Sequence, residues 1–165
     1  MGLNWRFLIS LTVISISFME LPTLNFSKKF DFKCKKKQNL FYIYDEIRKR
    51  FYLLTPEEWV RQHILHHLMY EKKIPKINLL VEQIVEINGM NKRLDIAVLK
   101  NNKPLLLVEC KAPEVKITQS TFDQIMRYNL ILDAEFLMLS NGLHHVYAQL
   151  DKENKKYQFL TDFNF

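Results

Sequence analysis

Two acidic residues and a lysine lie in apolar, strand-like runs, where acids are uncommon. Asp95 interrupts the run at residues 93–100, and Glu109 and Lys111 end the run at residues 104–111. Side chains two apart on a strand point to the same face, and an antiparallel pair places residues of the two strands side by side. The sequence therefore predicts two carboxylates and an ammonium group at one end of a sheet.

This trio suits metal-dependent hydrolysis of a phosphodiester bond. Two close carboxylates repel unless a cation lies between them, and Mg²⁺, for which Mn²⁺ would substitute, prefers carboxylate oxygens and water. The ion would neutralise charge on the scissile phosphate and lower the pKa of a water, and Lys111 would orient that water or the phosphate. The alternative is that Asp95 and Glu109 are strand-end charges paired with Arg93 or Lys111, because so short a pattern is common.

A helix precedes these strands. Thr55 suits the N-cap, Pro56 suits the first helical position, and Glu58 completes a capping box. The helix should end near Tyr70. Its buried stripe recurs every four residues and consists of Val60, Ile64 and Leu68.

The remaining elements predict an α/β sandwich with a mixed central sheet flanked by helices. Strand-like runs at residues 78–87, 93–100 and 104–111 are joined by Asn-Gly and Asn-Asn turns and should form an antiparallel meander. The third run is continuously apolar, which favours a central strand. A second helix at residues 118–133, a strand at 135–140 and an edge pair at 143–150 and 157–160 complete the order.

Composition fits one globular domain. The chain has 165 residues, of which 48% are hydrophobic, 25% charged and 13% aromatic, and these values exclude the disordered and low-complexity classes. Cys34 and Cys110 are too few for a disulfide framework, which favours a reducing compartment. We expect the main domain at residues 51–165.

The basic charge gathers in one segment. Residues 28–50 hold nine basic and three acidic residues, whereas residues 51–165 hold fourteen of each. We interpret residues 19–50 as a basic extension in which strands at 24–32 and 41–44 flank a lysine cluster. Lys35, Lys36 and Lys37 are candidates for contacts with nucleic-acid phosphates; a solvated hairpin is the alternative.

The first 18 residues form an apolar leader. The uncharged run Phe7–Phe18 follows Arg6 and resembles a secretory signal, although it is shorter than the roughly 20 residues that span a bilayer. The competing explanation is that translation starts at Met19. We favour the second, because the other features point to intracellular chemistry.

The motifs together resemble those of the PD-(D/E)xK nuclease superfamily, specifically the N-terminal nuclease domain of type I restriction enzyme R subunits and small stand-alone proteins like it. The matching features are Asp95, Glu109-Cys110-Lys111, Gln124-x-x-x-Tyr128, Asn141-Gly142 and the first-helix run Thr55–Gln62. The resemblance covers about residues 42–150. The helicase motor of a full R subunit is not matched, so translocation-driven cutting does not follow.

The resemblance implies a restriction-endonuclease-like fold and a Mg²⁺-dependent DNA endonuclease. Asp95 and Glu109 would bind the metal with the backbone carbonyl of Cys110, and Gln124 and Tyr128 would position a phosphate or the metal's water. A first-helix acid extends the metal site in related nucleases; Glu57 and Glu58 compete for this role, and we choose Glu58.

The implied partners are DNA and a restriction-modification or helicase protein, in the cytoplasm, with no membrane and no small-molecule cofactor. Two alternatives to this nuclease remain. The first is a catalytically inactive DNA-binding or assembly module with the same fold. The second, if the leader is a true signal, is a secreted or envelope protein.

Two further residue types have simpler interpretations. His63 and His67 have the i,i+4 spacing of a zinc-binding pair, but no third ligand follows in pattern, and surface histidines are the default. The side chain of Cys110 should point away from the carboxylates by strand alternation and act as a small buried hydrophobe.

Overall fold

The computed structural model describes residues 21–87 and 89–163. The predicted leader at residues 1–18, and with it the choice between Met1 and Met19, lies outside the described residues. Within the described part of the chain, no helix is long and apolar enough to cross a bilayer.

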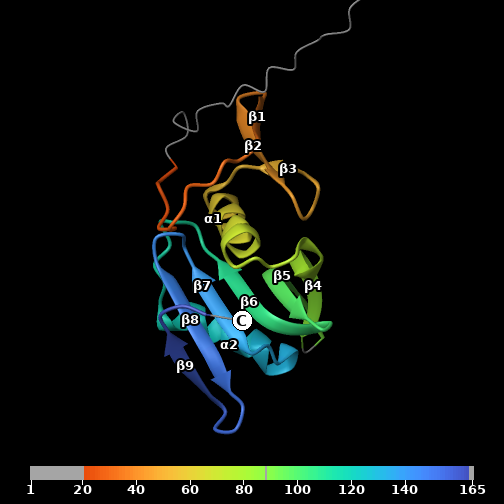
Figure 1. The fold of residues 1–165 in the computed structure, drawn as a ribbon, viewed down its shortest axis with the longest axis vertical. Helices are drawn as coiled ribbons and strands as arrows, with labels where there is room; N and C mark the ends of the chain where they lie inside the picture. Colours follow the sequence, from red (N-terminus) through yellow and green to blue (C-terminus); the bar gives the residue numbers. More distant parts are fainter. Residues whose placement is uncertain (1–20, 88, 164–165) are drawn as a thin grey trace, which may run out of the picture.

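The strands form two sheets (Figure 1). The three-stranded sheet contains, in order, β1 (Cys34–Lys37), β2 (Leu40–Asp45) and β3 (Arg50–Leu53). The six-stranded sheet contains, in order, β4 (Leu79–Ile87), β5 (Met90–Lys100), β6 (Lys103–Cys110), β7 (Phe136–Ser140), β8 (His145–Asp151) and β9 (Lys156–Leu160). Its pairing is antiparallel except between β6 and β7, so the sheet is mixed, as predicted.

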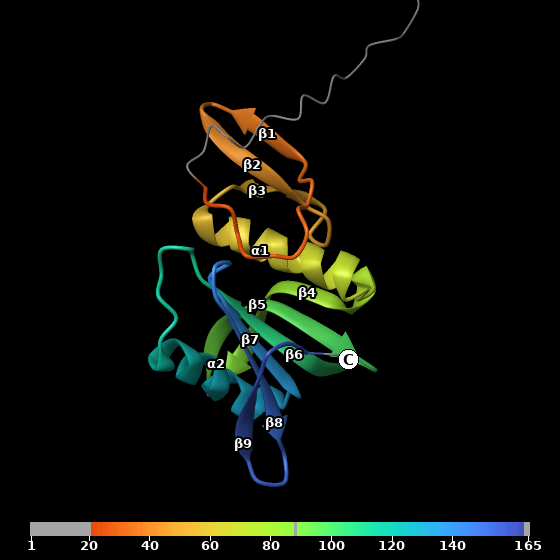
Figure 2. The ribbon, with the colours of Figure 1, turned by 60° about the vertical axis from the view of Figure 1, so that its left-hand side comes forward.

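Helices cover both faces of the six-stranded sheet (Figure 2). Helix α1 (Pro56–His66) runs into a π-helical turn (His67–Glu71) and lies between the two sheets, while α2 (Gln119–Leu132) lies on the opposite face of the larger sheet. The predicted stripe of α1, Val60, Ile64 and Leu68, is fully buried in the core that both sheets share. The α/β sandwich with helices on both faces is therefore confirmed.

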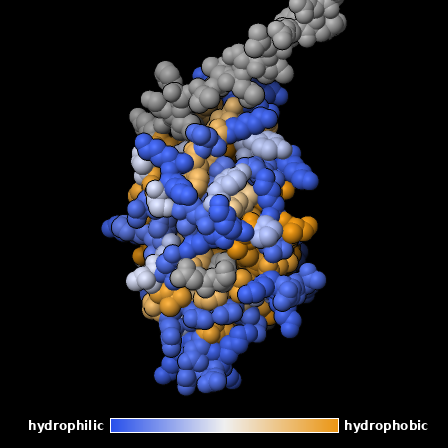
Figure 3. All heavy atoms as spheres, in the orientation of Figure 1, coloured by the Kyte–Doolittle hydropathy of each residue, from blue (hydrophilic) through white to orange (hydrophobic). Residues whose placement is uncertain are grey.

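Strand β6 is central because it is apolar on both faces. Leu106 and Val108 belong to the core beneath α1, and Leu107 belongs to the core beneath α2. Hydrophilic side chains cover most of the face shown in Figure 3, including the β8–β9 turn at its lower end.

Helix α2 makes the crossover between the parallel strands β6 and β7, and it matches the predicted range. Thr118 is its N-cap, and the backbone N–H of Thr118 donates to Thr121 Oγ1 at 2.9 Å. At the other end, Asp133 adopts the left-handed conformation, and the amide of Asn129 bonds both backbone groups of Ala134. These contacts end the helix and aim the chain into β7.

Two local predictions were wrong. Residues 24–32 form no strand; instead the lysine cluster itself forms β1, pairing with β2 from Cys34 opposite Ile43. The preceding chain packs its aromatic side chains on α1, with the rings of Phe32 and Trp59 5.0 Å apart. The capping box of α1 is only half formed: Glu58 N donates to Thr55 Oγ1, but the Glu58 carboxylate binds arginines instead of the cap.

Candidate active site

Asp95 of β5 and Glu109 of β6 lie side by side, as predicted. Glu109 is at the end of β6, but Asp95 lies in the middle of β5 and not near its end, because β5 begins at Met90, before the predicted start. The register pairs Ile96 with Val108, which places Asp95 opposite Glu109 one residue further along. Both carboxylates are buried, with 7% of each residue exposed. The backbone N–H of Cys110 donates to Asp95 Oδ2 at 2.7 Å, which fixes the aspartate against the end of β6.

Lys111 completes the predicted trio. Its Nζ donates to Glu109 Oε1 at 2.6 Å, and its backbone N–H donates to Ser140 O of β7 at 2.8 Å. Burial by itself lowers the pKa of Lys111, but the hydrogen bond and negative charge of Glu109 outweigh it and raise that pKa above its usual value. Lys111 is therefore held as a cation beside the carboxylates.

Glu109 is an acid whose ionised form is disfavoured. Burial raises its pKa, and the charge of Asp95 raises it further, against the opposing effect of Lys111. Two buried carboxylates at one strand end lack full compensation from the single ammonium group. An additional cation at this position would stabilise the ionised pair.

Arg61 of α1 supplies one such cation. Its Nη2 lies 2.7 Å from Asp95 Oδ1 and 2.9 Å from Glu57 Oε1, and its Nη1 binds Glu58 Oε2. Although Glu57 is partly exposed, Arg61 itself is only 3% exposed. Arg61 is held there by α1, whose apolar stripe fixes the helix over this end of the sheet.

Arg48, in the β2–β3 turn, extends this network. It forms ion pairs with Asp45, Glu58 and Glu82, and its guanidinium lies 3.3 Å from the centre of the Tyr52 ring. The network thereby joins the small sheet to α1 and β4.

The amide of Gln62 belongs to the same network. Its Nε2 donates to Asp45 Oδ2 at 2.7 Å and to Glu58 Oε1 at 2.9 Å. The run Thr55–Gln62 resembles a motif of the family, but the sequence did not predict the ion pairs of Arg61 or the hydrogen bonds of Gln62.

The two first-helix acids have different environments. Both oxygens of Glu58 are engaged by Arg48, Arg61 and Gln62. Glu57 is more exposed, and its charge contributes to the raised pKa values of Glu109 and Lys111. A metal-binding role for Glu58 stays a prediction.

Cys110 and Asn141-Gly142 support the site from behind. The Cys110 side chain is buried in the core beneath α1, as predicted, and burial raises the pKa of its thiol well above the usual value. Asn141 Nδ2 donates to Val115 O at 2.9 Å, which holds the chain after Lys111 against the end of β7. Gly142 has φ +81°, and a Cβ there would lie 2.8 Å from a side-chain carbon of Leu24, so this turn requires glycine.

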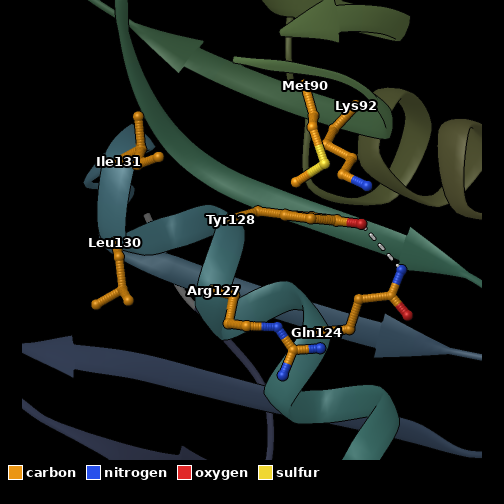
Figure 4. Close-up of a pocket in the computed structure, with 7 residues that line it drawn as sticks. All are labelled: Met90, Lys92, Gln124, Arg127, Tyr128, Leu130 and Ile131. Atoms are coloured by element: carbon orange, nitrogen blue, oxygen red, sulfur yellow. Dashed lines mark hydrogen bonds between the residues drawn. The ribbon is translucent and has the colours of Figure 1, made fainter. Parts of the chain in front are cut away.

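Gln124 and Tyr128 share one face of α2, as predicted. Gln124 Nε2 donates to the Tyr128 hydroxyl at 3.1 Å. Both line a pocket of about 630 Å³, and Figure 4 shows Met90 and Lys92 of β5 facing Tyr128 across it. Within residues 21–87 and 89–163, no hydrogen bond or ion pair joins Gln124 or Tyr128 to Asp95, Glu109 or Lys111. Their predicted roles at a phosphate or water therefore stay predictions.

The chemistry of the Asp95–Glu109 pair fits Mg²⁺. Mg²⁺ is usually held by one or two carboxylates and takes its other ligands from water and substrate phosphates. Asp95 Oδ1 is paired with Arg61, so this oxygen would have to leave the arginine to bind an ion. In the part of the chain that the structure describes, no three His, Cys, Asp or Glu side chains are arranged as a ready-made metal cage.

His63 and His66 are buried and His67 is partly buried, contrary to the expectation of surface histidines. His63 Nδ1 lies 2.9 Å from Trp59 O, and its ring lies 4.6 Å from that of Phe32. Burial lowers the pKa of His63 to about 4 and also lowers the pKa of His66. The aromatic residues before β1 cover this side of α1, which the histidine spacing alone did not reveal.

The three candidate lysines of β1 lie on two faces of the small sheet. Lys35 pairs with Tyr42 and Lys37 with Leu40, whereas Lys36 pairs with Phe41 on the other face. The ammonium of Lys36 lies 5.3 Å from the centre of the Phe41 ring. These lysines are exposed, but they cannot all contact one phosphate backbone from the same face.

Comparison with known proteins agrees with the motifs. The family described as "Type I restriction enzyme R protein N terminus (HSDR_N)" matches residues 56–163. No curated protein matches. A solved fragment of a putative HsdR subunit of a type I restriction enzyme from Vibrio vulnificus YJ016 is 20% identical, with a TM-score of 0.48; the match covers 67% of this chain and 24% of that one. Because the family match spans more than half of the sequence, this chain belongs to the type I restriction enzyme R protein N-terminal family.

Proposed function

We propose that this protein is a Mg²⁺-dependent DNA endonuclease that hydrolyses phosphodiester bonds. The observation that carries the proposal is the meeting of Asp95, Glu109 and Lys111 at one buried strand end, within a family of restriction enzyme domains. Membership of that family implies a restriction-modification context and interaction with DNA. The cleavage chemistry, the metal and the cytoplasmic location are parts of the proposal.

Asp95 and Glu109 would hold the metal ion. When bound, Mg²⁺ supplies positive charge to the scissile phosphate and makes water more acidic. The backbone N–H of Cys110 orients Asp95 for this role, and burial in the sheet shields Glu109 from solvent. A buried acid with a raised pKa gains most from a divalent cation, because the cation favours its ionised form.

Lys111 would act on the phosphate. Its ammonium remains charged and lies next to Glu109, and its backbone is fixed to β7 by the bond to Ser140 O. A compact ammonium group in a partly buried site stabilises negative charge that develops on phosphate oxygens more strongly than it would in water.

A catalytically inactive DNA-binding or assembly module is the second candidate. One observation favours it: Arg61 already neutralises Asp95, and Lys111 already neutralises Glu109. In such a module the charged cluster would serve only to fix α1 on the sheet.

Cleavage by the purified chain distinguishes the two candidates. Supercoiled plasmid, linear duplex, single-stranded DNA and RNA would be incubated with Mg²⁺, Mn²⁺ or EDTA. We expect DNA cleavage with either metal, none in EDTA, and none with Asp95→Asn or Glu109→Gln, while DNA binding survives because neither variant alters a surface charge. Asp133→Asn is the matched control, since Asp133 is exposed and asparagine tolerates its left-handed backbone. Cleavage by Asp95→Asn at the normal rate would refute the proposal.

A further inference from the structure

The three-stranded sheet has one buried and one open face. On β2, Ile43 and Asp45 are fully buried toward α1, and alternation places Tyr42 and Tyr44 on the opposite face. The register adds Phe51, opposite Tyr44, and Leu53, opposite Tyr42, to the open face. We call this set, with Lys33, Lys35 and Leu40, the aromatic face. It lies on the far side of α1 from the six-stranded sheet (Figure 2).

Aromatic rings and leucines give this face an apolar surface. Tyr42, Tyr44 and Phe51 are each partly exposed, and the rings of Tyr44 and Phe51 lie 5.2 Å apart. Leu40 and Leu53 are 49% and 44% exposed. A sheet that buries only one side ordinarily has a hydrophilic outer face. The exposed rings and leucines on this outer face therefore indicate a ligand with flat apolar groups.

Lysines lie over the rings. Lys35 Nζ is 4.0 Å from the centre of the Phe51 ring, and Lys33 Nζ is 5.2 Å from that of Tyr44. Neither lysine forms an ion pair within the described ranges 21–87 and 89–163, unlike Arg48 and Arg61. Their charges are therefore available to anions that approach the rings.

Charge and position set this face apart from the candidate active site. Residues 28–50 carry the whole basic excess of the chain after Met19, and strands β1, β2 and β3 all precede residue 56, where the family match begins. The aromatic face thus lies outside the residues that the family matches, and no carboxylate of the Asp95–Glu109 pair belongs to it.

We propose that the aromatic face binds single-stranded DNA, with bases stacked on Tyr42, Tyr44 and Phe51 and phosphates paired with Lys33 and Lys35. Rings on an open sheet with cations beside them match the requirements of unpaired nucleotides, whose bases stack and whose phosphates seek positive charge. A duplex hides its bases and would leave the rings and leucines without a partner. Binding needs no metal, so the inference goes beyond the proposed function and rests on it only for the choice of DNA over RNA.

Fluorescence anisotropy with labelled oligo(dT), in EDTA, tests the proposal in the full chain. Phe51→Leu keeps an apolar side chain but removes the stacking surface, and it should weaken binding to oligo(dT) about tenfold without changing binding to a duplex of the same length. Tyr42→Leu repeats the test if Phe51→Leu lowers the melting temperature. EDTA prevents cleavage, so failure here is separate from failure of the nuclease proposal.

The lysines provide a second measurement. Lys33→Gln with Lys35→Gln should reduce the slope of log affinity against log salt by about 0.7 for each lysine on single strands, whereas Lys36→Gln, the matched control on the other face, should leave it unchanged. Wild-type affinity in both leucine variants, equal loss on single strands and duplex, or an equal effect of Lys36→Gln would overturn the proposal. Tighter binding to oligo(U) than to oligo(dT) would overturn the choice of DNA.

Discussion

The end of β6 beside Asp95 and the aromatic face of the small sheet both carry several charged residues, but the two regions differ in how these charges are paired and exposed. At the end of β6, the buried charges are paired: Arg61 binds Asp95, and Lys111 binds Glu109. On the aromatic face, Lys33 and Lys35 rest on rings and are open to solvent.

Burial decides what the same charged residue types do in the two regions. Buried charges interact strongly and tolerate no missing partner, so they fix geometry and suit chemistry. Exposed charges contribute little to stability but steer and hold charged ligands. Variants in the two regions should therefore change different observables.

Removal of Arg61 should have the largest effect on stability. Arg61→Met leaves the Asp95 and Glu58 carboxylates buried without their main partner, which should lower the free energy of unfolding by about 3 to 5 kcal/mol. Urea denaturation measures this loss. In the double variant with Asp95→Asn, the loss should be smaller than the sum of the single losses; strict additivity would show that the ion pair has no energetic coupling.

Acid should destabilise the protein through a buried neutral group. The pKa of His63 is about 4 in the folded chain and about 6.5 when unfolded, so only the unfolded chain takes up the proton between these values. The stability from neutral His63 is complete above pH 6.5 and falls by about 3 kcal/mol as the pH drops to 4. His63→Phe should flatten that part of the pH profile, measured by urea denaturation, relative to a His144→Ala control. An identical profile would contradict the buried, neutral histidine.

Variants of Lys111 test whether the paired charges at the end of β6 take part in catalysis. Lys111→Ala should reduce the cleavage rate by on the order of 10² or more, because the developing charge of the transition state loses its cation. Lys111→Arg should restore the rate only in part, since a planar guanidinium differs in reach and hydration from an ammonium. Full activity of Lys111→Arg would indicate a purely electrostatic role.

The aromatic face should show the smallest effect on folding. Lys35→Gln removes an exposed charge that has no acidic partner in the described residues, so the free energy of unfolding should change by less than about 0.5 kcal/mol. Thermal melting beside Arg61→Met makes the comparison direct. A loss above 2 kcal/mol would mean that Lys35 is structural.

Local patterns were sufficient to predict much of this fold. The apolar period correctly predicted that Val60, Ile64 and Leu68 are buried, although residues 58–66 proved to be buried on all sides of α1. The unbroken apolar run of β6 predicted a central strand. The meeting of Asp95 with Glu109 does not follow from the turn alone. The turn pairs Leu99 with Pro104, and a bulge at Val98–Leu99 then shifts the register by one residue and brings Glu109 opposite Asp95.

Contacts between residues far apart in sequence were not predictable in this way. Arg48 meets Glu58 and Glu82 only after the small sheet folds over α1, and no spacing within one element encodes that meeting. The lysine cluster was placed between two predicted strands, yet alternation lets a strand expose Lys35 while Cys34 packs inward. Burial of His63 depends likewise on the aromatic residues that precede β1.

The central claim is that the Asp95–Glu109 pair holds a divalent cation, and a titration with Mn²⁺ alone tests it most directly. Electron paramagnetic resonance of free Mn²⁺ would follow binding to the full wild-type chain, to Asp95→Asn and Glu109→Gln, and to the Asp133→Asn control, without DNA. We expect one site in the wild type and in the control, and loss of this site in both other variants. Equal Mn²⁺ binding by all four proteins would contradict it.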